Sequence, residues 1–80
     1  MNRIVWRLRG STDKIVECCL EHTTYNLHAV TVVLGRETFL EEAYPDVRSA
    51  TERAASVRDR LLASGGWTVI AEAAVGLSSR

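Results

Sequence analysis

The apolar residues of this chain change their spacing at Tyr44-Pro45-Asp46, and this change restricts the possible folds more than any other feature of the sequence. Before that point, apolar and polar residues mostly alternate, as in half-buried β-strands. After it, apolar residues recur at steps of three and four, as on one face of a helix. The sequence therefore predicts a single α+β domain over residues 1–80, an antiparallel four-stranded meander followed by one helix.

The first two strands are expected over Arg3 to Arg9 and over Ile15 to His22, joined by a turn at Gly10-Ser11-Thr12-Asp13. One register makes all cross-strand pairs favourable at once, whereas a slip of one residue would set apolar side chains against charged ones. The expected pairs are Leu8 with Val16, Trp6 with Cys18, Ile4 with Leu20, Arg7 with Glu17 and Arg3 with Glu21.

The next hairpin joins the β-branched stretch Leu27 to Leu34 to a strand from Glu37 to Ala43. Gly35-Arg36 suits a two-residue turn with glycine in its first position. That turn pairs Val32 with Phe39, whereas a three-residue turn pairs Val32 with Leu40. The sequence leaves this register open.

The helix is expected to begin between Asp46 and Ser49, because Ser49 and Glu52 have the spacing of a capping box. Gly65-Gly66 predicts a left-handed C-terminal cap after about 15 residues. The apolar stripe of the helix consists of Val47, Ala50, Ala54, Val57 and Leu61. It is expected to cover the sheet face that carries Ile4, Trp6, Leu8, Val16, Cys18 and Leu20.

The segment from Trp67 to Val75 alternates weakly and is interpreted as either a fifth strand or an apolar tail that binds another copy. Residues 68–80 are thus an oligomerisation segment or a frayed end, the latter above all from Leu77 to Arg80.

Composition and charge restrict the partners of the chain. It has ten basic and ten acidic residues, so it carries no formal net charge. No apolar stretch approaches the ~20 residues of a membrane helix, and the charges within Met1 to Arg9 leave no room for a secretory signal. We expect a cytoplasmic protein with no membrane partner, and its two cysteines do not form a disulfide framework.

Two stretches, Val30-Thr31-Val32-Val33-Leu34-Gly35-Arg36-Glu37 and Ala63-Ser64-Gly65-Gly66-Trp67, together with the helix between them, resemble a loose group of small bacterial proteins of unknown function. In that group a four-stranded meander runs into an arginine- and alanine-rich helix that ends in Gly-Trp. The resemblance covers most of residues 3–67 and implies a fold but no activity. A fainter similarity is to HicB-type antitoxin domains, although their glycine-rich segment between strands and helix is missing from Glu41 to Asp46.

Metal ligation and catalysis are not expected. Cys18, Cys19, His22 and His28 are ligand types, but Cys18 and His22 would lie ~13 Å apart on a strand, too far to share a zinc ion. Only the two histidines can face each other, and two ligands do not make a structural zinc site. No phosphate loop is present, and a small meander offers little concavity for a substrate. We therefore predict no enzyme activity, no cofactor and no small-molecule substrate.

Two binding functions remain. Nucleic-acid binding would use arginines on one sheet face and exposed aromatic rings, namely Arg3, Arg7 and Arg9 with Tyr25 or Trp67. The neutral charge and the glutamates opposite those arginines disfavour it. Association into a homodimer is favoured, because a meander has two edges and the C-terminal segment has no evident place in the core of a monomer. The expected dimer contacts are Trp67, Val69, Ile70 and Val75.

Overall fold

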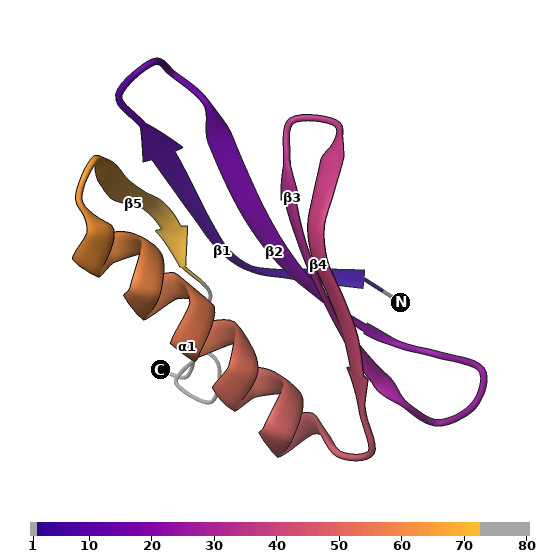
Figure 1. Ribbon diagram of the computed structural model, residues 1–80. Helices are drawn as coiled ribbons and strands as arrows, with labels where there is room; N and C mark the ends of the chain where they lie inside the picture. Colours follow the sequence, from indigo (N-terminus) through magenta and orange to yellow (C-terminus); the bar gives the residue numbers. More distant parts are fainter. Residues whose placement is uncertain (1, 73–80) are drawn as a thin grey trace.

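One antiparallel sheet and one helix make up the described part of the chain (Figure 1). The computed structural model describes residues 2–72. The elements are β1 (Asn2–Gly10), β2 (Ile15–His22), β3 (His28–Leu34), β4 (Glu37–Tyr44), α1 (Val47–Ser64) and β5 (Trp67–Glu72). The strand order is β4-β3-β2-β1-β5. The α+β class and the four-stranded meander are confirmed, and the fifth strand extends the same sheet.

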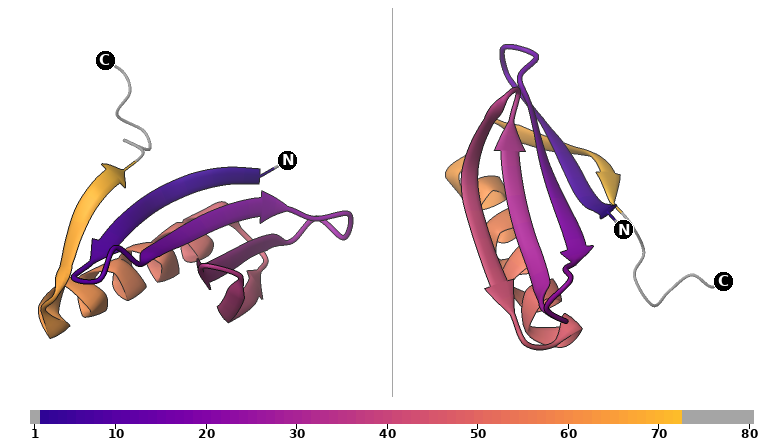
Figure 2. Two further views of the ribbon diagram at one scale, coloured as in Figure 1. Left: turned by 90° about the horizontal axis from the view of Figure 1, so that it is seen from above. Right: turned by 90° about the vertical axis from the view of Figure 1, so that its right-hand side faces the viewer.

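The helix connects the two edge strands, β4 and β5, and lies along one face of the sheet (Figure 2). We call this side the helix face and the opposite, uncovered side the open face. Within residues 2–72, no helix has the length and apolar character that crossing a membrane would require.

The core lies between α1 and the helix face. Trp6 and Leu8 of β1 are fully buried, as are Ala50 and Ala54 of α1. The alanines bring the helix backbone close enough for the indole Nε1–H of Trp6 to donate a hydrogen bond of 2.8 Å to the carbonyl oxygen of Ala54. The other core residues are Val5, Val16, Cys18, Leu20, Val30 and Val32. The predicted helix-covered face is therefore confirmed, except for Ile4.

An extra residue in β1 explains that exception. The expected pairs Leu8–Val16, Arg7–Glu17 and Trp6–Cys18 are confirmed. A β-bulge at Val5 then shifts the register, so that Ile4 pairs with Cys19 and Arg3 with Leu20. The expected pairs Ile4–Leu20 and Arg3–Glu21 are wrong, because an extra residue exchanges the two faces for every residue before it. Ile4 lies on the open face, 41% exposed, while Val5 is buried.

A bulge also settles the register of the second hairpin. Gly35, at φ 62°, and Arg36 form the expected two-residue turn, and Leu34 pairs with Glu37. Beyond it, Phe39 is an extra residue, so Val32 pairs with Leu40. The structure thus combines the shorter of the two turns with the pairing expected for the longer one.

The helix begins and ends close to the expected residues. Its N-cap is Asp46, whose Oδ1 accepts a hydrogen bond of 2.7 Å from the backbone N–H of Ser49. The cap is therefore Asp46 and not Ser49. Gly65 ends the helix with φ 85° and donates its N–H to the carbonyl of Leu62. The helix has 18 residues, because its last turn continues to Ser64.

The fifth strand occupies the outer edge of β1. Trp67 pairs with Gly10 and Val69 with Leu8, and Ile70 is the extra residue of a third bulge. The half-buried ring of Trp67 packs against the core and lies over Gly10, where an added Cβ would come within 3.0 Å of it. The expectation that this segment has no place in the core of a monomer is wrong for Trp67. Residues 68–72 belong to the sheet, whereas Val75 and the expected frayed end lie outside the described residues.

Candidate association surface

The two edges of the sheet differ in charge. The edge strand β4 carries Glu37, Glu41 and Glu42. Glu42 accepts hydrogen bonds from the Tyr44 hydroxyl at 2.5 Å and from Arg53 of α1 at 2.9 Å, which lower the pKa of its carboxyl. The remaining glutamates are exposed. Charges on an edge strand discourage pairing with another chain, so β4 is the better protected edge.

The opposite edge, β5, is short and mainly apolar. Val69 is 39% exposed and Ile70 is 40% exposed. Within Trp67–Glu72 the only charged residue is Glu72, which forms an ion pair with Arg58 of α1. Among the strands of residues 2–72, β5 has β1 as its one neighbour. Its outer backbone groups are therefore available for a further strand.

An apolar groove lies between α1 and the strand ends that carry the β1–β2 and β3–β4 turns. Its volume is about 300 Å³. Phe39 is one of its lining residues and is 62% exposed. The others come from five elements: Val16, Val32, Leu34, Leu40, Val57, Leu61 and Trp67. Because Trp67 also begins β5, the groove and the β5 edge are continuous.

The arginines proposed to contact nucleic acid do not share one face. Arg7 is held by Glu17, as expected, with an N–O distance of 2.6 Å. Arg9 is exposed and lies with Arg7 on the open face, whereas the bulge at Val5 moves Arg3 to the helix face. Tyr25 is 85% exposed but lies in the loop between β2 and β3, beyond the strand ends. The structure therefore brings together only Arg7 and Arg9 of these four residues.

The cysteines lie on opposite faces and are both free, as the alternation predicts. Burial raises the pKa of the Cys18 thiol to about 12, with a further contribution from the neighbouring Cys19. For Cys19, burial and then the charge of Glu17 raise the pKa, and these effects exceed the opposing effect of Arg7. Neither thiol is therefore activated as a nucleophile.

The two histidines do meet across the end of β2 and β3. His22 pairs with His28, and their rings are stacked with centroids 4.7 Å apart and planes 2° from parallel. In the part of the chain that the structure describes, no group of three or more His, Cys, Asp or Glu side chains is placed to hold a metal ion.

Sequence reasoning missed two features of these surfaces, the exposure of Phe39 and the position of Arg3. Both follow from bulges, which the apolar pattern does not encode. The available signal was the unbroken apolar run Ile4-Val5-Trp6, because alternation fits such a run in either of two frames.

Comparisons with protein-family models, with curated proteins and with solved structures find no match to this chain.

Proposed function

We propose that this protein is a non-catalytic association module that forms a homodimer through the edge of β5. The observation that carries the proposal is the contrast in charge between the edges: β5 exposes Val69 and Ile70 and its one charged residue is paired, whereas β4 exposes Phe39 but also carries three glutamates. An unprotected apolar edge is a template for a further strand. In a two-fold arrangement, β5 of each copy would pair antiparallel with β5 of the other.

The charges favour β5 over β4 as the strand at the dimer interface. Antiparallel pairing of two β4 strands would bring the glutamates of both copies together, and like charges opposite each other destabilise a sheet. Pairing of two β5 strands brings together mainly apolar side chains, while Glu72 is already engaged by Arg58. The apolar groove adjoins the proposed dimer interface at Trp67 and enlarges the apolar surface available there.

Sedimentation of the full chain and of two lysine variants tests the proposal. Ile70→Lys adds a charge to β5 at a bulge residue that has no direct partner on β1. Thr38→Lys makes the matched change on β4, where Thr38 is exposed. At about 50 μM we expect dimers for the wild type and for Thr38→Lys, and monomers for Ile70→Lys.

Circular dichroism must show that both variants keep the fold. The proposal is wrong if the folded wild type is a monomer at this concentration, or if Thr38→Lys dissociates the dimer as effectively as Ile70→Lys. Substitution is the appropriate test, since removing β5 would strip a strand and the Trp67 ring from the sheet.

Nucleic-acid binding receives less support, because Arg3 and Tyr25 lie apart from Arg7 and Arg9 and because Glu17 engages Arg7. Retention of the chain on single-stranded nucleic acid at ~50 mM salt, lost as salt is raised, would favour this alternative.

A further inference from the structure

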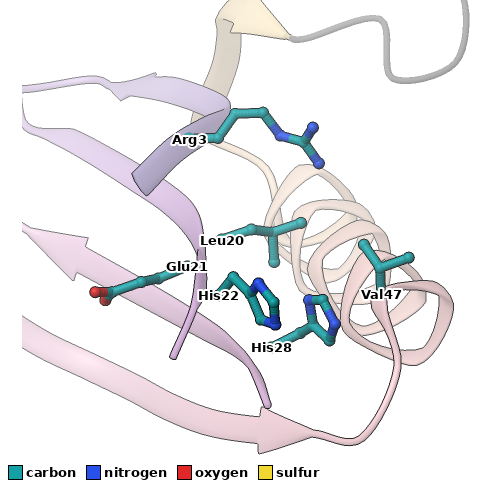
Figure 3. A pocket seen from close by; sticks show the side chains of 6 residues that line it. All are labelled: Arg3, Leu20, Glu21, His22, His28 and Val47. Carbon is teal, nitrogen blue, oxygen red and sulfur yellow. The ribbon is translucent and has the colours of Figure 1, made fainter. Parts of the chain in front are cut away.

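A second concave site lies at the end of the sheet that carries the loop between β2 and β3, opposite the β1–β2 and β3–β4 turns. Its volume is about 340 Å³, within the size range of small-molecule sites. Four elements contribute to it: β1, the end of β2, the start of β3 and the first turn of α1 (Figure 3). The lining residues are Arg3, Leu20, Glu21, His22, His28 and Val47.

The bulge in β1 is what brings Arg3 to this site. With unbroken alternation, Arg3 would lie on the open face opposite Glu21. With Val5 as an extra residue, Arg3 pairs with Leu20, a core residue of the helix face. Figure 3 shows its side chain extending over the pocket toward α1, while Glu21 points away. Bulges commonly re-aim a side chain in this way beside functional sites.

The histidines are held in place by the loop between β2 and β3. His22 Nε2 lies 2.7 Å from Asn26 Oδ1, and the parallel stacking of the rings fixes His28 against His22. Asn26 has φ 61°, and the loop is tied by Thr23 Oγ1, which accepts hydrogen bonds from the backbone N–H groups of Tyr25 and Leu27. The imidazole side of the pocket is therefore ordered before any ligand arrives.

The chemistry of the lining favours a singly charged anion. Arg3 supplies one permanent cation, and no ion pair within residues 2–72 engages it. A guanidinium binds a carboxylate through two parallel hydrogen bonds, and His28 offers a ring N–H as a further donor. Leu20 and Val47 supply an apolar wall. We propose that this pocket binds a small monocarboxylate with an apolar body.

A doubly charged phosphate suits the site less well. Glu21 at the rim and Asp46 at the N-cap beside Val47 oppose any anion, and because this repulsion grows with the charge of the ligand, it disfavours a dianion more than a monoanion. The apolar wall would also remain unused by inorganic phosphate. The proposal is independent of dimerisation, because the pocket does not include β5.

Titration of the isotope-labelled full chain with benzoate, followed by NMR, tests the proposal. We expect saturable shifts of the Leu20 and Val47 methyl groups and of the His28 ring, with a Kd on the order of 1 mM for so small a probe. Arg3→Gln should weaken binding about tenfold or more, because the charged half of the contact is lost. Arg9→Gln, the same change on the open face of the same strand, should leave the Kd unchanged.

Neutral benzamide and inorganic phosphate provide the comparisons of ligand chemistry. Both should bind at least about tenfold more weakly than benzoate. The proposal is overturned if benzoate up to ~20 mM moves none of these resonances, if benzamide binds equally well, if phosphate binds more tightly, or if Arg9→Gln costs as much as Arg3→Gln. The backbone spectrum of each variant checks that its fold is intact.

Discussion

Trp6 connects the sheet to the helix. Its side chain is fully buried, and its indole N–H donates to the carbonyl of Ala54, a residue that is itself fully buried in α1. A buried indole usually needs such a partner, because an unpaired polar group in the core is costly. Trp6 therefore contributes apolar burial and also a defined position of α1 along the helix face.

Replacing Trp6 by phenylalanine removes the hydrogen bond and part of the buried volume. We expect Trp6→Phe to lower the free energy of unfolding by about 1 to 3 kcal/mol, as measured by urea denaturation. Trp67→Phe is the matched control, because the ring of Trp67 is only half-buried, and it should cost less. Equal losses of unfolding free energy for the two variants would contradict a specific stabilising contribution of the hydrogen bond from Trp6 to Ala54.

At the scale of elements, the start of α1 depends on one carboxylate. The pKa of Asp46 lies below its ordinary value of 3.8, chiefly because the backbone N–H of Ser49 donates to the carboxylate. A group whose pKa is lowered by folding stabilises the fold above its unfolded pKa, and that contribution is lost as the pH falls through the folded value. The cap is thus fully effective at neutral pH.

We expect Asp46→Ala to lower Tm by about 3 to 6 °C at pH 7, because an N-cap acceptor is lost. Asp46→Asn, which keeps an acceptor oxygen, should lose less. Thermal melts between pH 7 and pH 2.5 provide the measurement. The advantage of the wild type over Asp46→Ala should hold above pH 3.8 and shrink below it. An advantage that is unchanged at the lowest pH would contradict the role of the charged cap.

At the scale of the whole molecule, most of the architecture could be predicted from the sequence. The elements follow from the two periods on either side of Pro45, and three pairs of the first hairpin follow from their chemistry. The candidate sites could be predicted less completely than the fold, because they depend on extra residues in β1, β4 and β5. The run Ile4-Val5-Trp6 puts an apolar side chain inward in either frame, so the pattern does not determine which frame the preceding Arg3 follows.

Dimerisation through β5 would couple stability to concentration. A chain that associates only when folded gains stability with its own concentration. We expect Tm to rise by several degrees between about 5 and 500 μM protein, as measured by calorimetry. Ile70→Lys should abolish this dependence, whereas Thr38→Lys should keep it. A wild-type Tm that is constant over the range would contradict association of the folded chain.

The bulge at Val5 also has an evolutionary consequence. An in-frame loss of the Val5 codon would remove the bulge but leave Ile4 opposite Cys19 and Arg3 opposite Leu20, because Val5 is the residue without a partner on β2. The pocket would keep its cation, while the core would lose the buried side chain of Val5. A substitution of the exposed Arg3 would instead remove the cation and leave the core residues unchanged, so natural selection can act on the pocket and on the sheet separately.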